Sequence, residues 1–523
     1  MLQPYESDLS VKVADDLITE KSPLSFDHVP GPAILKLWYK YWKYVPLFGT
    51  QLFHSVLINR LTEGNLWNRN STPLQYLFNR YGPIVRLGGP LLNDIVLIHR
   101  PEHISKVFDE EGEMPTRSGI DILQHYRLNH RQYRFSGPFC TQGQESLKWL
   151  ETKKSLRAPI AEQLKNQFRK LDKSCNEFVS RIRQIKNRQD EVPDNFNSEL
   201  ARWGMECFWI LMINKQIGFL DSAGYEENSE PTKFIKALMN AQLYLSRCEN
   251  GFQFWRFMET PSSKKLFDAC DVIDGIIRKY IRFAQTSQQH DSALKLENKN
   301  YINSTILETM LIKQNMNPNE ASTLLMDMVI LGVLATTNSL SFLLYYLSKN
   351  PRVQRNLHHE IISKTASDLI LEKKTFDEMP YLNACMKECL RLRPPFPYLT
   401  RLLSKSISLH GYTIPKGTYL IMANQLSSQR EENFEDSEKF RPERWMTDNV
   451  CHPKNSYLPF GKGLRSCIGE DMAKIEMMLL ITKILLEYRI EYDYGDIHSN
   501  MLMMNVPSKP LRFRFIERDE CRN

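Results

Sequence analysis

The feature that most constrains this chain is a glycine-flanked cysteine just before a long apolar stretch. The run from Phe460 to Gly469 places Arg465 two residues before Cys467, with glycines on both sides of the cysteine. Glycine lets a backbone pass close to a flat ligand, a thiolate can bind iron, and a guanidinium can pair with a carboxylate. A turn with an ordinary half-buried cysteine is the alternative, and the complete spacing favours a haem held by the Cys467 sulfur.

This run resembles the haem-binding signature of the cytochrome P-450 family at five positions: Phe460, Gly463, Arg465, Cys467 and Gly469. The resemblance implies a haem-dependent monooxygenase that uses dioxygen. It implies that Cys467 is the proximal thiolate on the iron of haem b and that Arg465 pairs with a haem propionate. It also implies a mainly α fold with a minor β-sheet, in which the haem lies between a long oxygen-side helix and the helix after the cysteine.

Composition is compatible with one large domain. The 523 residues are 42% hydrophobic and no linker or repeat divides them, so we expect a catalytic domain over 29–523 after a disordered or targeting lead at 1–28. Ten scattered cysteines favour a reducing compartment over a disulfide framework. The net charge of +7 suits an acidic partner, an anionic membrane or a scattered basic surface, and nothing suggests nucleic acid.

The N-terminal region gives conflicting signals about targeting. Residues 1–28 contain six acidic residues and no arginine, unlike a mitochondrial presequence. No continuous apolar run of about 18 residues exists, so we expect no transmembrane anchor. Residues 35–61 mix aromatic and lysine side chains, which predicts either an amphipathic helix packed on the domain or interfacial membrane contact.

Hydrophobic periodicity predicts mostly helices. We expect the longest helix at 318–350, where Asn317 is a cap-like residue, Pro318 suits the first turn and Glu320 completes a capping box. The other predicted elements are strands within 86–99 and 405–425 and helices within 142–270 (one from 200 towards Gly218), 376–393 and 471–488.

An acid and a base lie three residues apart at Glu388 and Arg391. Such a pair is ordinarily a surface feature of a helix. Its context resembles the Glu-x-x-Arg helix of the family, which implies a buried ion pair that links to Arg444. We expect these residues to specify the fold rather than to touch substrate.

Three further residues resemble propionate ligands of the family. Trp149 and Lys153 match its Trp, three residues, Arg pattern, with lysine in place of arginine. Lysine offers a point charge rather than a planar fork. Arg401 is a third candidate by family position. The alternative for Trp149 and Lys153 is an ordinary amphipathic helix.

The oxygen-activation motif departs from the family pattern. Residues 332–337 retain Gly332, Thr336 and Thr337, but Val333 replaces a glycine and Ala335 replaces an acid. The resemblance implies that Thr336 relays protons, although a threonine is no source of them near neutral pH. The alternative is that both threonines bond their own helix backbone.

Several segments are similar to the mitochondrial clan of the family: 114–117, 125–127, 137–143, 202–206, 217–220 and 386–388. This implies electrons from an acidic ferredoxin and a peripheral position on the matrix side of the inner mitochondrial membrane, the endoplasmic reticulum membrane being the alternative. Glu470 and Asp471 stand where the clan has arginines, so docking must use other cations, with Lys462, Lys387 and Lys474 as candidates.

The clan resemblance points to a hydrophobic substrate. A steroid fits best, with the insect ecdysteroid hydroxylases as the nearest resemblance and a place in ecdysteroid biosynthesis as the implied role. Xenobiotic oxidation remains an alternative. Because Ala335 is no acid, a haem-thiolate isomerase or dehydratase that needs no external electrons is another.

Overall fold

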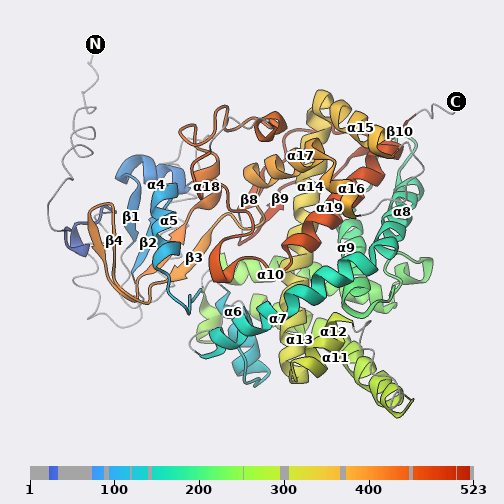
Figure 1. Cartoon of the computed structure of the whole chain (residues 1–523), viewed down its shortest axis with the longest axis horizontal. Helices are drawn as coiled ribbons and strands as arrows, with labels where there is room; N and C mark the ends of the chain where they lie inside the picture. The colour runs from blue at the N-terminus through green and yellow to red at the C-terminus, as the bar shows by residue number, and fades with distance from the viewer. Residues whose placement is uncertain are drawn as a thin grey trace. The chain divides into compact units, whose positions relative to one another are not determined.

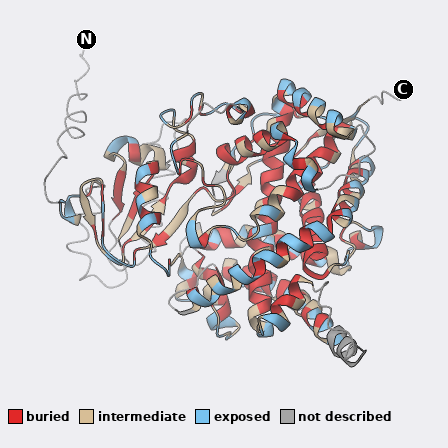
Figure 2. Cartoon of the chain, viewed as in Figure 1, coloured by how far each residue is buried: buried red, intermediate tan, exposed pale blue. Residues whose placement is uncertain are grey.

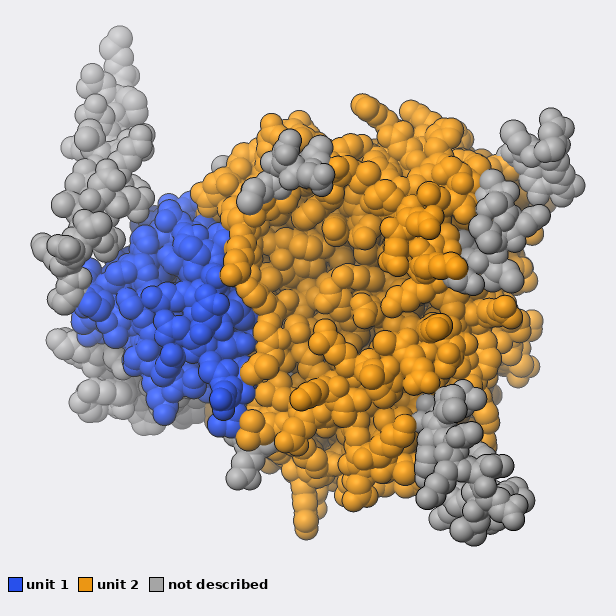
Figure 3. All heavy atoms as spheres, in the orientation of Figure 1, with its two compact units in different colours: residues 1–115, 400–422 blue, residues 116–399, 423–523 orange. Residues whose placement is uncertain are grey.

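The computed structural model describes residues 23–32, 73–87, 94–117, 120–138, 144–250, 253–294, 305–365, 373–446, 452–501 and 503–518. The predicted amphipathic segment at 35–61 lies outside them. The chain forms two compact units (Figure 3): unit 1 comprises Met1–Pro115 and Thr400–Met422, and unit 2 comprises Thr116–Leu399 and Ala423–Asn523. Helices dominate and the sheets are small, as the sequence predicts for the fold class.

The largest sheet has the strand order β1-β2-β6-β3, with β1 at Ile84–Leu87, β2 at Ile95–Ile98, β6 at Tyr419–Met422 and β3 at Leu399–Leu402. Strand β1 pairs antiparallel with β2, whereas β2 pairs parallel with β6. Unit 1 also contains a hairpin of β4 (Ile407–Leu409) and β5 (Tyr412–Ile414) and the helices α4 (Pro73–Tyr81) and α5 (Pro101–Glu110). The short helical turn η1 spans Phe26–His28. The predicted strands within 86–99 and 405–425 are therefore confirmed.

Unit 2 is built from helices around an apolar core. Its longer helices are α7 (Gln144–Asn166), α8 (Phe168–Ile185), α9 (Phe196–Ile213), α10 (Glu230–Asn250), α11 (Pro261–Leu294), α15 (Pro351–Thr365), α17 (Pro380–Leu392) and α19 (Glu470–Glu487). Shorter elements are α6 (Asp121–His125), η2 (Tyr126–His130), η3 (Ser222–Tyr225), η4 (Phe254–Arg256), α12 (Ile306–Glu308), η5 (Thr309–Lys313), α16 (Lys373–Asp377), α18 (Asn424–Ser428), η7 (Pro442–Trp445), η8 (Gly463–Arg465) and strands β7 (Tyr488–Glu491), β8 (Ser499–Met501), β9 (Asn505–Pro507) and β10 (Arg514–Glu517). Trp203 and Trp209 on α9 are among its largest fully buried side chains.

A continuous helical stretch runs through unit 2 from Pro318 to Lys349 (Figure 1, yellow) and packs against α9 and α19. It consists of α13 (Pro318–Asp327), a π-helical turn η6 (Met328–Val333) and α14 (Leu334–Lys349). Asn317 and Glu320 form the predicted capping box. The stretch is long and apolar enough to cross a membrane, but 83% of its most apolar window is buried within the protein, as in a core helix (Figure 2).

One predicted boundary is wrong. Helix α9 ends at Ile213 rather than near Gly218, because Asn214 adopts a left-handed conformation with φ of 58° and its N–H bonds back to Ile210. The following turn is held by the buried carboxylate of Glu206, which accepts N–H bonds from Ile217 at 2.7 Å and Phe219 at 2.6 Å. A buried acid satisfying loop amides stops the helix although the apolar periodicity continues.

Candidate active site

The loop before α19 is a tight backbone turn that ends at Cys467. The Cys467 N–H donates to the Phe460 carbonyl at 2.9 Å, and the Ser466 N–H donates to the Gly463 carbonyl at 3.1 Å. Gly461 and Gly463 have φ values of 70° and 72°, in the left-handed region that glycine adopts without strain. The glycines thus shape the turn itself, and Gly469 caps α19.

Cys467 differs from the other cysteines of the described chain. Cys175, Cys207, Cys248, Cys270, Cys385 and Cys389 are buried, whereas Cys467 is exposed. Burial nevertheless raises the pKa of the Cys467 thiol, although an N–H bond from Gly469 and nearby cations oppose that rise. Cys467 thus has accessible surface, yet enough protein surrounds its thiol to disfavour the charged form.

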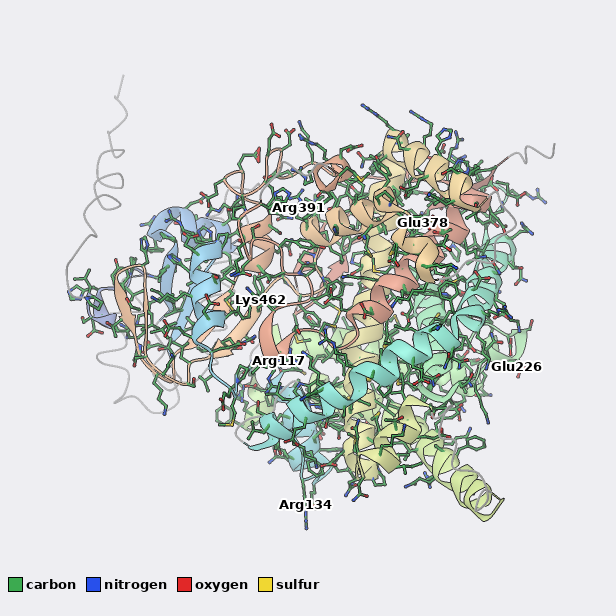
Figure 4. The ribbon with its side chains drawn as sticks, in the orientation of Figure 1. Arg117, Arg134, Glu226, Glu378, Arg391 and Lys462 are labelled. Carbon is green, nitrogen blue, oxygen red and sulfur yellow. The ribbon has the colours of Figure 1, made fainter. Side chains whose placement is uncertain are left out.

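Positive charges surround this cysteine. Arg465 is 4% exposed, and its guanidinium donates to the Pro138 carbonyl at 3.1 Å and to Ser146 Oγ at 2.5 Å. Arg117, labelled in Figure 4, and Lys153 both lie close enough to favour the ionised sulfur. The sequence identified Arg117 only as the last residue of the clan segment 114–117, and its positive charge was the available signal for a role beside Cys467. Nothing in the sequence marked Ser146.

The predicted Trp149–Lys153 pair lies on α7, with Trp149 partly buried against the core. Lys153 Nζ donates to the carbonyls of Leu464 and Ser466 at 3.0 and 2.6 Å and to Ser466 Oγ at 2.9 Å. Burial lowers its pKa to about 8, against the opposing influence of Cys467. Lysine in place of arginine therefore bonds the cysteine loop directly, a contact that the sequence did not reveal.

Glu388, Arg391 and Arg444 meet in the interior of unit 2. Glu388 and Arg391 are 0% exposed, and the Glu388 carboxylate accepts bonds from Arg391 at 2.8 and 2.9 Å and from Arg444 Nε at 3.1 Å. The Trp445 indole and the Arg441 N–H donate to the same carboxylate. Burial opposes ionisation of Glu388, but these bonds hold its pKa below the usual value. Arg391 is labelled in Figure 4.

The long helix is open at one turn. Gly332 is exposed, and a Cβ built there would meet nothing within 4 Å. Thr336 Oγ1 donates to the Gly332 carbonyl at 3.2 Å and Thr337 Oγ1 to the Leu334 carbonyl at 3.3 Å, so both hydroxyls bond their own helix. Ala335 is partly buried beside them.

Arg401 belongs to unit 1. Its Nε donates to Glu111 Oε2 at 2.6 Å, its Nη1 donates to the Thr400 carbonyl at 2.8 Å, and its guanidinium lies 5.1 Å from the Phe108 ring centroid. This predicted propionate ligand thus has an acidic partner of its own.

The candidate docking cations differ in their partners. Lys474 pairs with Glu470 at 2.5 Å in the first turn of α19, so it neutralises an acid that would repel an acidic protein. Lys462, labelled in Figure 4, donates to Asn455 at 2.9 Å, and Lys387 lies 5.8 Å from the Trp445 ring centroid. Lys462 and Lys387 thus keep their positive charges free of an acid among the described residues.

The chemistry of these residues fits a haem. No group of three His, Cys, Asp or Glu in the described part of the chain could hold a metal ion, and one cysteine suffices where a cofactor brings the metal's other ligands with it. A porphyrin does so, and its propionates would meet the cations around Cys467. An exposed cysteine in a glycine turn, with cations beside it, is the arrangement expected of a haem-thiolate protein.

Comparison with known proteins agrees. The family profile of Cytochrome P450 matches residues 49–515. Cytochrome P450 CYP12A2 of Musca domestica is 30% identical over 88% of both chains, and probable cytochrome P450 12a5, mitochondrial, of Drosophila melanogaster is 30% identical over 84% of both. The mitochondrial 1,25-dihydroxyvitamin D(3) 24-hydroxylase of Mus musculus is 28% identical over 96% of this chain and 91% of its own. The chain belongs to the cytochrome P450 family and is a haem-dependent monooxygenase.

Proposed function

We propose that this monooxygenase hydroxylates a hydrophobic, steroid-like substrate with electrons from a ferredoxin, and that Cys467 ligates haem b. The observation that carries the ligand assignment is the exposure of Cys467 among described cysteines that are otherwise buried. The reduced, carbon monoxide-bound protein should show the red-shifted Soret band of thiolate ligation, and Cys467→Ala should abolish it. Retention of the band in that variant would refute the assignment.

The remaining predicted residues hold and shape the site. When bound, haem supplies the redox centre at which dioxygen is activated for insertion into a C–H bond. Phe460, Gly463 and Gly469 shape the loop that presents the sulfur. Of the predicted propionate ligands Arg465, Trp149, Lys153 and Arg401, Arg465 best combines burial with proximity to Cys467.

The proton path uses this chain's hydroxyl rather than an acid. Thr336 donates to the Gly332 carbonyl at 3.2 Å beside the open turn of the helix, so its proton is held at the exposed glycine. Ala335 supplies no proton, and we propose that water or a substrate hydroxyl replaces the missing acid. Ala335→Asp should change the ratio of product formed to electrons consumed, and an unchanged ratio would contradict this.

The substrate class is supported by the relatives. One is named a 1,25-dihydroxyvitamin D(3) 24-hydroxylase, a hydroxylase of a steroid-derived molecule. A spin-shift titration of the haem with a steroid panel that includes ecdysteroid precursors tests the proposal. A response to none of them would refute the steroid assignment and favour xenobiotic oxidation.

Ala335 also favours a second candidate, an isomerase or dehydratase that rearranges an oxygenated substrate. Such an enzyme needs neither dioxygen nor a reductant. Turnover that depends on both would exclude it.

We propose that the ferredoxin docks on cations near the cysteine loop. Arg157 on α7 is exposed and close enough to Lys153 to lower its pKa, and Lys462 lies in the loop itself. Arg157→Glu and Lys462→Glu should each weaken ferredoxin binding and make it less dependent on salt. Lys233→Glu on α10 is the matched control, and equal effects in all three variants would contradict the docking face.

We propose that the protein lies on the matrix side of the inner mitochondrial membrane; the word mitochondrial in the names of relatives supports the organelle. The segment between α10 and α11 exposes Phe254, Phe257 and Met258, which are 44%, 67% and 66% accessible. Exposed apolar side chains suit interfacial contact. Phe257→Ser with Met258→Ser should reduce flotation with anionic phospholipid vesicles more than Met446→Ser, and an equal effect would refute this contact.

A further inference from the structure

Lys153 uses all its hydrogen-bonding capacity on the cysteine loop. An ammonium has three donors, and Lys153 Nζ has three acceptors: the carbonyls of Leu464 and Ser466 at 3.0 and 2.6 Å and Ser466 Oγ at 2.9 Å. We propose that Lys153 is a positioning residue that holds the backbone before Cys467 and sets the charge beside its sulfur, rather than a propionate ligand. This proposal rests on the proposed ligation of haem by Cys467.

The choice of lysine follows from the acceptor geometry. Three oxygens from two residues of the loop, Leu464 and Ser466, converge on one nitrogen, which suits the compact head of lysine. The planar fork of arginine separates its donors and favours flat bidentate partners such as carboxylates. The lysine at the position where the family pattern has arginine is therefore matched to the loop and not to a carboxylate.

The bond to Ser466 also acts through the peptide that enters Cys467. The Ser466 carbonyl accepts from Lys153, and the N–H of the same peptide donates to the Phe460 carbonyl at 2.9 Å. A cation on the carbonyl polarises that peptide and strengthens its N–H bond, because bonds in a chain reinforce each other. Lys153 thereby stabilises the turn that fixes the sulfur.

The charge has a second effect. A positive charge beside an anionic sulfur offsets part of the negative charge that the sulfur presents to the iron, and this favours the reduced iron. Removal of the ammonium should therefore lower the reduction potential. The neighbouring Lys154 is exposed and forms no ion pair among the described residues, so it provides a control for a nearby charge without the loop contacts.

The test compares holoenzymes of the wild type, Lys153→Met, Lys153→Arg and Lys154→Met. Spectroelectrochemical titration gives the reduction potential, and the reduced carbon monoxide complex gives the rate at which the red-shifted band converts to the blue-shifted form. For Lys153→Met we expect the reduced-to-oxidised ratio at a fixed potential to fall by about tenfold, or ~59 mV for one electron, and the conversion rate to rise several-fold. Lys153→Arg should restore most of the potential and little of the loop stability, and Lys154→Met should match the wild type.

Equal behaviour of Lys153→Met and Lys154→Met in both measurements would overturn the proposal. If Lys153→Met does not retain haem, the variants Ser466→Ala and Lys153→Arg test the positioning role instead. Ser466→Ala keeps the charge and removes one acceptor, so it should convert faster at an unchanged potential, and wild-type behaviour of both variants would overturn the positioning role. A red-shifted band that survives Cys467→Ala refutes the haem ligation itself, a different result from equality of the two lysine variants.

Discussion

Close packing between α9 and the long helix makes Gly204 a sharp test of this structure. A Cβ added at Gly204 would lie 2.9 Å from both Val333 Cγ1 and Thr337 Cγ2, whereas ordinary van der Waals contact begins at 3.4 Å. Val333 is 8% exposed, so it has little free space into which to retreat. Gly204→Ala must therefore displace the helix or the two side chains.

The magnitude follows from two opposing effects. Overpacking a core by one methyl group costs about 1–3 kcal/mol, and alanine gains about 1 kcal/mol over glycine in a helix. We expect Gly204→Ala to cost about 1 kcal/mol and Val333→Ala about 2 kcal/mol. In the double variant the methyl group added at position 204 occupies space left by Val333, so the total should be at least about 1 kcal/mol below the sum of the two.

Urea unfolding followed by the fluorescence of the buried Trp203 and Trp209 measures this cycle. Gly275→Ala is the matched control, because a Cβ there meets nothing within 4 Å and the helix should gain stability. Additivity of Gly204→Ala and Val333→Ala within about 0.5 kcal/mol would refute the packing argument.

Three further predictions concern buried charge and helix capping. Glu388→Gln leaves two buried guanidiniums without a counter-ion and should cost about 3–5 kcal/mol in urea unfolding. Glu378, labelled in Figure 4, forms an exposed ion pair with Lys364, so Glu378→Gln should cost under about 1 kcal/mol. Burial raises the pKa of Glu476 to about 8, so the folded state binds the Glu476 proton more tightly than the unfolded state does, and stability falls as pH rises from about 4.5 to 8. Glu476→Gln should remove up to about 1.4 kcal/mol of that loss per pH unit. Parallel profiles of unfolding free energy against pH for the variant and the wild type would contradict this. Asn317→Ala should cost about 1 kcal/mol through loss of the cap, and thermal unfolding no different from that of Asn319→Ala would contradict it.

The sequence predicts local structure where one residue type has one physical role. Asn317, Pro318 and Glu320 form the predicted cap because each satisfies an amide or tolerates its absence. The turn within Phe460–Gly469 is equally predictable, since glycines allow the left-handed backbone at 461 and 463. The end of α9 is not predictable from the sequence, because the helix ends where the Glu206 carboxylate accepts bonds from loop amides, and hydrophobic periodicity does not reveal those bonds.

Contacts in the site between residues far apart in the sequence could be predicted only through the family resemblance. Nothing in the spacing of Glu388 and Arg391 shows that they are 0% exposed or that Arg444 joins them. The three bonds of Lys153 depend on the meeting of α7 with a loop more than 300 residues later, which is a tertiary fact. Side-chain type constrained the chemistry of the site, and tertiary packing decided which partners each side chain found.

The two departures in the oxygen-side motif have different physical standing. Val333 replaces a glycine, but its side chain faces Gly204 on α9, so a glycine on the neighbouring helix accommodates the added volume. Nothing in the neighbouring turn compensates for Ala335 in the same way. The hydroxyls of Thr336 and Thr337 bond carbonyls of their own helix and are not acidic enough to replace a carboxyl group. The first departure is therefore a matter of packing and leaves chemistry untouched. The second removes a proton source. The ratio of product formed to electrons consumed should therefore depend on substrate hydroxyls or on water in a way that changes with substitution at position 335 and does not change with substitution at position 333.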